Sequence, residues 1–424
     1  MRIDPDGTLG AVLASEGLGM TETLVNGAGG CRSRTQIVMR DVIPSYSPED
    51  TGCCRSRYFS RQSRLPCTYL NGDDMVFGCD EKVGAAIESI REVSGKGTAM
   101  VDTLAATLAC TEHSLPVGGG PIMPDRDLSS LSFDEGYDVM TRTILNNSDL
   151  SGDRGDVSVN ILGYGISDMG WETGSGNIRN LLSAMGIDDV RFIGCRDGDT
   201  RGLGSADLDV MVHPQRSVMT AAFLSERYGI RTLRPSEGAP VGYSATRSLV
   251  EEVGRELDLD PQPALDIIDR EERDVRMRLL NLNKGVNGLR SRTLCIECGS
   301  SIAYPLTVWM VGRFGLVPGS IRIHDDAYRN EIRDYLSGLG FADALDAPLP
   351  EDPDVVFTDG LDAFYGSRAM TPTSHIAVEM PFMRNIDLLG RCIIGTAGCR
   401  YLLDEMLNNV GRFRCGQPSN ADMR

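Results

Sequence analysis

The chain has 424 residues, a mass of 46.0 kDa and a formal net charge of −18. Such a charge argues against nucleic acid or an anionic membrane as a general partner, and no apolar run is long enough to span a bilayer. Twelve cysteines without an export signal indicate a reducing compartment, so we expect a cytoplasmic protein whose thiols serve metals rather than disulfides.

The first third of the chain places three cysteines on turns next to apolar stretches. Cys31 follows a Gly-rich turn, and Cys53 follows Gly52. Cys110 closes the apolar run 104–109. Glycine lets the backbone come close to a bulky cofactor, and thiolate sulfur is a ligand that iron prefers. The three cysteines therefore predict an iron–sulfur cluster held by three separate loops, unlike a ferredoxin run with ligands two or three residues apart.

Between the second and third of these cysteines, residues 73–78 are predicted to form a short strand that runs into a helix. Val83, Ile87 and Ile90 recur at helical spacing in that following helix and form its apolar face. Further thiols lie nearby at Cys54, Cys67 and Cys79.

Short apolar strands and amphipathic helices alternate along the rest of the chain. A polar stretch over 146–156 indicates a domain boundary. The predicted strands cover 157–163, 190–194, 208–212, 293–297, 320–324 and 355–357, and the predicted helices run through 178–185, 218–228, 264–289, 302–314 and 327–336. This alternation is typical of parallel sheets covered by helices. We expect three α/β domains, over 1–150, 151–290 and 291–424, around a central cleft.

The cysteine spacing and the residues around it resemble the component 1 proteins of nitrogenase and nitrogenase-like reductases. The similarity lies in Gly52-Cys53-Cys54-Arg55-Ser56-Arg57-Tyr58-Phe59, then Leu65-Pro66-Cys67, then residues 73–78. In that family a Gly-Cys turn, an aromatic and basic segment and a D-x-V-F-G-G strand come in the same order. Cys79 stands here in place of the second glycine. The pair Cys53-Cys54 is also similar to the nickel-tetrapyrrole reductive cyclase subunit, and weaker similarity continues to about Asn409.

The resemblance implies Rossmann-like domains with mainly parallel sheets and a [4Fe–4S] cluster bound by Cys31, Cys53 and Cys110. Cys54 and Cys67 are additional candidate ligands. It also implies a separate ATP-hydrolysing iron–sulfur reductase protein as the electron donor, and assembly into a homo- or hetero-oligomer with another component 1-like subunit.

Other cysteines are expected to be structural, because a lone cysteine is more often a small buried apolar residue. Cys295 and Cys298 have metal-ligand spacing, but in a predicted strand their side chains would point to opposite faces. Cys392 and Cys399 flank a Gly-rich turn. We expect all four to pack in the core.

The histidines bear on the substrate. His213 ends an apolar strand, about where the nitrogenase catalytic subunit has the cysteine that anchors its metal cofactor. Ile394 stands near the family's cofactor-binding histidine. The lack of both anchors argues against dinitrogen reduction, although His213 is equally well interpreted as a hydrogen-bonded histidine at a strand end. His113, three residues after Cys110, is the candidate proton donor.

Seven arginines and only three acids lie between Arg32 and Arg64, against the overall charge. Guanidinium groups bind carboxylates and phosphates bidentately, so Arg32, Arg34, Arg55 and Arg57 are candidates for holding an anionic substrate such as a tetrapyrrole, or an acidic partner. A solvated loop face is the alternative.

Two functions fit these observations. In the first, the chain is the substrate-reducing component of an ATP-dependent two-component reductase that acts on a tetrapyrrole or another small molecule. In the second, it is a scaffold for the assembly of an iron–sulfur cofactor, for which the extra thiols at Cys54, Cys67 and Cys79 would be suited.

Overall fold

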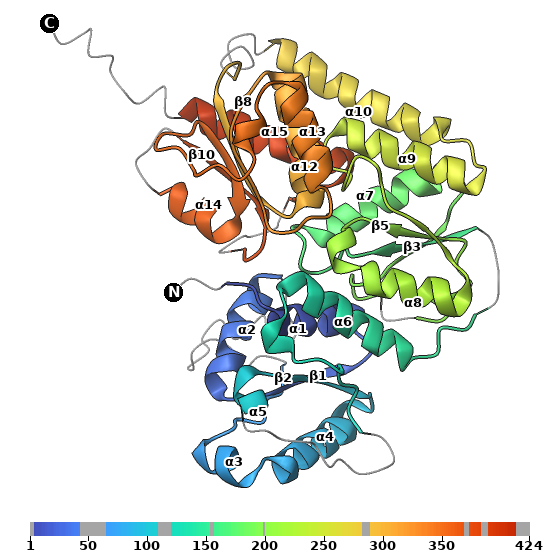
Figure 1. Ribbon diagram of the computed structural model, residues 1–424. Helices are drawn as coiled ribbons and strands as arrows, with labels where there is room; N and C mark the ends of the chain where they lie inside the picture. Colours follow the sequence, from blue (N-terminus) through green and yellow to red (C-terminus); the bar gives the residue numbers. More distant parts are fainter. Residues whose placement is uncertain are drawn as a thin grey trace, which may run out of the picture.

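The computed structural model describes residues 4–42, 65–108, 120–152, 157–197, 200–281, 289–368, 373–382 and 389–412. Within these ranges the strands form three sheets in which every pairing between named strands is parallel, with helices packed alongside (Figure 1). The predicted α/β fold with parallel sheets is confirmed. No helix in this part of the chain is long and apolar enough to cross a membrane.

The first sheet has two strands, β1 (Glu22–Asn26) and β2 (Thr98–Asp102). The helices around it are α1 (Gly7–Leu18), α2 (Gly29–Val42), α3 (Gly72–Phe77), α4 (Asp80–Ser94) and α5 (Leu104–Leu108). Successive strand residues point to opposite faces, so Leu24 and Met100 pack against α4, whereas Val25 and Val101 join the core that contains α1. Figure 1 shows the sheet between these two layers.

The prediction of a strand at 73–78 is wrong, because these residues form helix α3. The Asn71 side chain accepts hydrogen bonds from the backbone N–H of Asp73 and of Asp74, at 2.9 and 3.1 Å. The Asp74 carboxylate in turn accepts from the Asn71 N–H at 2.7 Å. This capping box starts a helix immediately before the apolar residues that suggested a strand.

The second and third sheets have four strands each, in the orders β4-β3-β5-β6 and β10-β9-β7-β8. The second contains β3 (Ser158–Leu162), β4 (Asp189–Phe192), β5 (Leu208–Met211) and β6 (Arg231–Leu233), with α7 (Trp171–Ser183), α8 (Val218–Tyr228), α9 (Tyr243–Leu257) and α10 (Gln262–Asn281). The third contains β7 (Thr293–Cys298), β8 (Val317–Ile323), β9 (Val355–Asp359) and β10 (Ser374–Glu379), with α12 (Ser300–Phe314), α13 (Arg329–Gly338), α14 (Gly360–Gly366) and α15 (Gly395–Arg412).

Helix α6 (Phe133–Asn146) connects the first sheet's layer to the second, because it packs against both α1 and α8. Helix α15 similarly packs on α7 and α9 as well as on β10. The packing of α1 against α6 requires glycine: a Cβ added at Gly136 would lie 2.2 Å from the carbonyl oxygen of Gly7. One apolar core extends from α1 and α6 through the second and third sheets, whereas α4 packs on the other face of the first sheet in a separate apolar cluster.

Gly136→Ala should therefore lower the free energy of unfolding by about 1–3 kcal/mol, since the added methyl forces α1 and α6 apart. Gly176→Ala in α7 is the matched control, because nothing lies within 4 Å of a Cβ there. Alanine is the better helix former, so the control should be neutral or more stable by up to about 1 kcal/mol. Denaturant unfolding of both variants measures the difference. Equal changes in the free energy of unfolding for the two variants would mean that α1 and α6 accept the added methyl group without destabilisation.

Candidate functional site

The carboxyl edge of the first sheet brings together loops that are far apart in the sequence. Asn26, at the end of β1, donates from Nδ2 to Asp102 Oδ1 at the end of β2, at 2.9 Å. Its Oδ1 accepts from Thr68 Oγ1 at 2.8 Å, and the same Thr68 oxygen accepts from the Gly27 N–H at 3.0 Å. These bonds hold the segment around Cys67 against the turn that leads into α2.

Cys31 and Cys67 are neighbours at this edge. Cys31 lies in the first turn of α2 and is half-buried, as is Cys67, which pairs by a parallel bridge with Val25. The Cys67 Sγ lies 3.4 Å from the Gly27 carbonyl oxygen and accepts from the Tyr69 N–H at 3.4 Å. Burial raises the pKa of the Cys67 thiol. The hydrogen bond from the Tyr69 N–H lowers this pKa, and the nearby Cys31 raises it further. Two partly accessible thiols, one in the first turn of α2 and one in the segment bridged to β1, therefore lie at the same sheet edge.

The other predicted ligands and donors lie outside the described residues: Cys53, Cys54, Cys110, His113, Arg55 and Arg57. Among the residues that are described, no three His, Cys, Asp or Glu side chains form a metal-binding group. Convergence of Cys31, Cys53 and Cys110 stays a prediction. The chemistry of the described pair fits a soft-metal cluster, because both thiols are partly accessible at a sheet edge.

The two described arginines of the basic segment have different surroundings. Arg32 lies over the Tyr69 ring, 5.5 Å from its centroid, and donates from Nε to the Leu65 carbonyl oxygen at 3.0 Å. Its positive charge lowers the pKa of Cys67, against the effect of burial. Arg34 instead pairs through Nη1 with Asp6, at 2.6 Å, and Asp6 is the N-cap of α1. Arg32 thus faces the thiols, whereas Arg34 joins two helices.

The cysteines expected to be structural are buried. Cys295, Cys298, Cys392 and Cys399 are each at most 1% exposed. Burial raises the pKa of Cys298 and of Cys399 well above the ordinary value, which keeps these thiols protonated. They are placed as core residues rather than as ligands.

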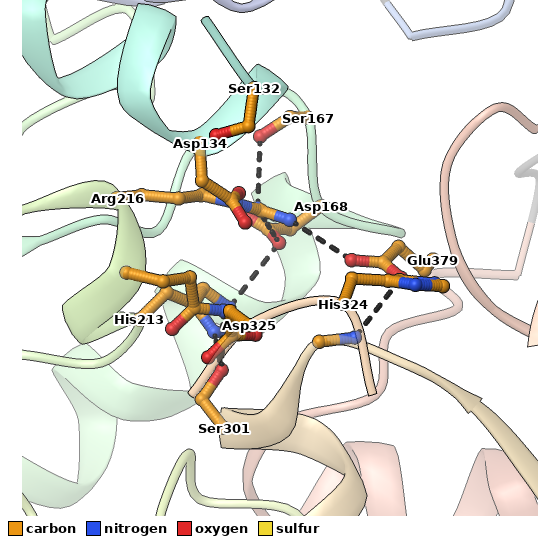
Figure 2. A network of polar contacts seen from close by, with 12 residues as sticks. Ser132, Asp134, Ser167, Asp168, His213, Arg216, Ser301, His324, Asp325 and Glu379 are labelled. Carbon is orange, nitrogen blue, oxygen red and sulfur yellow. Dashed lines mark hydrogen bonds and ion pairs between the residues drawn. The ribbon is translucent and has the colours of Figure 1, made fainter. Parts of the chain in front are cut away.

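A second polar site, centred on Arg216, lies between α6 and the carboxyl ends of strands in the second and third sheets. This residue ends the short 3₁₀ helix η4 (Pro214–Arg216) directly after β5, and its side chain is 2% exposed. It donates from Nε to Asp134 at 2.6 Å, from Nη1 to Asp168 at 2.9 Å and from Nη2 to Glu379 at 3.3 Å (Figure 2). The three carboxylates come from α6, from the turn after β3 and from the end of β10. One guanidinium therefore joins all three parts of the fold.

His213 extends this network on its buried side. Its Nδ1 lies 2.7 Å from Ser301 Oγ, and its Nε2 lies 3.3 Å from Asp168 Oδ1 (Figure 2). The order serine, histidine, aspartate is that of a hydrolase triad. However, Ser301 and His213 are fully buried, and Gln215 also donates to Ser301 Oγ at 2.9 Å. The group therefore packs the interior, and His213 is a hydrogen-bonded histidine at a strand end.

Charge in the network is distributed unequally among the carboxylates. Burial alone would raise the pKa of Asp168, but Arg216 and His213 hold it below the ordinary value. Burial raises the pKa of Glu379 to about 7 despite the opposing attraction of His324 and Arg216. The His324 side chain is half exposed, and its Nε2 lies 3.6 Å from Glu379 Oε2. Glu379 is thus the member of the network that exchanges a proton near neutral pH.

The pH dependence of the free energy of unfolding should reflect the protonation of Glu379. Between about pH 5 and 7 native Glu379 retains a proton that the unfolded chain has released, so its contribution to the unfolding free energy falls by roughly 2–3 kcal/mol as pH rises. Glu379→Gln cannot ionise and should lack this fall, whereas Glu226→Gln on the exposed face of α8 should retain it. Denaturant unfolding at several pH values tests this. Identical pH profiles for Glu379→Gln and the unsubstituted protein would contradict it.

The sequence analysis missed Arg216, Asp134, Asp168 and Glu379. One signal was available: Asp168 and Arg216 both follow predicted strands, and the carboxyl ends of parallel strands meet at one edge of a sheet. Asp134 in a helix and Glu379 at the end of a distant strand carried no comparable signal.

Comparisons with known proteins agree with this architecture. The family model described as nitrogenase component 1 type oxidoreductase matches residues 126–410. One of the subunits of the light-independent protochlorophyllide reductase from Rhodospirillum rubrum is 24% identical over 210 residues, which cover 47% of this chain and 37% of that protein. The same subunit from Methylobacterium sp. (strain 4-46) is 37% identical over 92 residues, 21% of this chain and 17% of that one. The matched part thus spans about a third or less of these curated relatives.

Solved structures show the same fold over the whole chain. A structure titled "Nitrogenase Cp1 at pH 6.5" superposes with a TM-score of 0.77 at 16% identity, covering 100% of this chain and 96% of that one. A second, at pH 5, gives a TM-score of 0.65 at 15% identity, covering 98% and 90%.

Proposed function

The chain belongs to the family of nitrogenase component 1 type oxidoreductases, and from this premise we propose that it is the iron–sulfur, substrate-reducing component of an ATP-dependent two-component reductase in the cytoplasm. Cys31, Cys53 and Cys110 bind a [4Fe–4S] cluster, with Cys54 and Cys67 as further candidate ligands. The observation that carries the proposal is the joining of the Cys31 and Cys67 loops at the carboxyl edge of the first sheet. When bound, such a cluster accepts and passes on single electrons.

The surface beside this edge has the exposed apolar side chains expected of a protein-binding surface. Val76 and Phe77 on α3 are 74% and 84% exposed, and Leu104 and Leu108 on the contacting helix α5 are also exposed. Grouped exposed apolar side chains of this size are typical of interaction surfaces. We assign this face, formed by α3 and α5, to contact with another component 1-like subunit or with the ATP-hydrolysing reductase protein.

The substrate proposed is a tetrapyrrole or another small anionic molecule rather than dinitrogen. His213 and Ile394 occupy the positions near which the resemblance places the anchors of a large metal cofactor, and both are buried in the core. Arg32, Arg55 and Arg57 would hold carboxylates of the substrate, and His113 would supply the proton that accompanies each electron. Arg34 contributes less, because it is paired with Asp6.

The alternative, a scaffold for cofactor assembly, is favoured by the half-buried second thiol at Cys67 beside Cys31. A scaffold releases its cluster to an acceptor protein during function, whereas a reductase component retains it through turnover. Iron content before and after incubation with substrate and reductase protein separates the two.

The substrate assignment is tested with Arg55→Ala/Arg57→Ala and His113→Ala. The double arginine variant should bind a dicarboxylate tetrapyrrole at least tenfold more weakly, since each lost charge-assisted hydrogen bond costs about 1.5–3 kcal/mol. His113→Ala should bind it normally and lose turnover by about 10²–10⁴-fold. Arg273→Gln, on the exposed face of α10, is the control. Normal substrate and partner binding by the arginine variant would make the basic segment a solvated surface, and normal turnover by His113→Ala would exclude it as the proton donor.

A further inference from the structure

A groove far from the cysteine loops has no role in the proposed reductase function. It has a volume of about 550 Å³ and lies between α9, α10 and α12, with Leu403 of α15 at one side. Figure 1 shows these helices at the end of the molecule opposite α3 and α4. Its volume is within the roughly 300–1,000 Å³ range of small-molecule sites. We call it the α9–α10–α12 groove.

The floor of the groove is apolar. It is formed by Val275, Leu279, Leu280, Val308, Trp309, Phe314 and Leu403. Leu280 is 57% exposed, although it is part of this apolar floor. An apolar body seated in the groove would remove this side chain and the floor from water, which stabilises the complex by about 25 cal/mol per Å² of apolar surface covered.

The rim of the groove carries an unbalanced set of charges. Arg247, Arg276 and Arg313 all lie within ion-pair distance of Glu272, at 3.3, 3.1 and 3.7 Å. Arg247 also pairs with Asp269, at 2.7 Å. Among the described residues that line the groove, three are arginines and only Glu272 is acidic, so positive charge predominates at its rim.

Tyr243 forms part of the aromatic wall of the groove. It is 6% exposed, lines the groove and packs edge-on against Trp309, with 6.2 Å between ring centroids. Its buried hydroxyl has no hydrogen-bond partner among the residues that the structure describes. Because this oxygen has almost no accessible surface, Tyr243 contributes its ring rather than its hydroxyl to the wall of the groove.

We propose that the α9–α10–α12 groove binds a small amphiphile with an apolar body and a single carboxylate. The apolar floor takes the body, and the arginine rim takes the head group, because a planar guanidinium matches a carboxylate bidentately. The predominance of arginine at the rim fits an anionic rather than a cationic or neutral head group. This inference is independent of the cluster and of the reductase function.

Isothermal titration of the full chain with dodecanoate tests the proposal, and Trp309 fluorescence reports occupancy. Dodecanoate should bind saturably with one site per chain. Leu280→Glu, which places a negative charge on the floor, and Arg276→Gln, which removes one positive charge from the rim, should each weaken binding about tenfold or more. Arg273→Gln, three residues away on α10 and outside the groove, should leave it unchanged.

Three results would overturn the proposal: no saturable binding of dodecanoate, equal binding of dodecyltrimethylammonium, or equal binding by Arg276→Gln. Because the Arg276 side chain is 55% exposed, that variant should fold even where Leu280→Glu does not. Tighter binding of dodecyl phosphate than of dodecanoate would contradict the assignment to a carboxylate.

Discussion

Replacing Arg216 by methionine should lower the free energy of unfolding by about 3–5 kcal/mol, because removal of one partner from a buried ionic group leaves the other charges uncompensated. Asp168 is almost fully buried and depends on Arg216 for its low pKa. Asp134 and Glu379 lose their contacts at 2.6 and 3.3 Å in the same substitution. Since these three acids belong to different parts of the fold, we also expect the parts to unfold less cooperatively.

The matched control is Arg227→Met on α8, whose guanidinium is exposed and donates to Asn146 at 2.9 Å. Its loss should cost no more than about 0.5–1 kcal/mol. The cost of Arg216→Met should shrink as the pH falls from 7 to 4.5, because burial raises the pKa of the orphaned carboxyls and they take up protons over this range. Denaturant unfolding at pH 7 and pH 4.5 measures both effects. A cost similar to that of the control, or one that does not change with pH, would show that the carboxylates are stabilised by other groups.

The second large effect concerns iron. Alanine at Cys31, Cys53 or Cys110 should remove most of the bound iron and abolish turnover, because a cluster that loses one of three protein thiolates is no longer held on that side. Cys295→Ala is the control, since that thiol is buried in β7 and burial raises its pKa to about 11. Cys67→Ala should lower the iron content if Cys67 is an additional ligand. It should leave the iron content unchanged if Cys67 only packs beside Cys31.

Iron analysis of anaerobically purified variants measures this directly. Retention of full iron content by Cys53→Ala or Cys110→Ala would contradict the three-loop arrangement. Loss of iron in Cys295→Ala as severe as in Cys31→Ala would show that unfolding, not ligation, determines the iron content.

The alternation of apolar strands and helices predicted much of the fold because a central parallel strand such as β3 is buried on both faces and reads as a short apolar run. Strand β6, which has no buried residue, gave no such pattern. The same reasoning failed at residues 73–78. Val76 and Phe77 look like a buried strand, but they are exposed on a helix that starts at the Asn71 cap. A run of apolar residues on an exposed surface has the same local sequence pattern as a run of apolar residues in the core.

The candidate site was predictable only in part. Glycine before cysteine marked the loop that carries Cys31, and the structure places Cys67 next to it. Around Arg216, the ends of the predicted strands indicated only that Arg216 and Asp168 share one sheet edge. Asp134 and Glu379 lie 82 and 163 residues from Arg216 along the chain. Their approach to Arg216 depends on how α6 and the third sheet pack on the second sheet, and no spacing in the sequence encodes that.

The most direct test of the proposed reductase function is electron paramagnetic resonance of anaerobically purified, dithionite-reduced protein, combined with iron and acid-labile sulfide analysis of the same sample. We expect iron and sulfide in equal amounts and a signal typical of a reduced [4Fe–4S] cluster, which disappears in Cys31→Ala. Protein that is folded but contains neither iron nor sulfide, and shows no such signal after anaerobic reconstitution, would contradict the proposal.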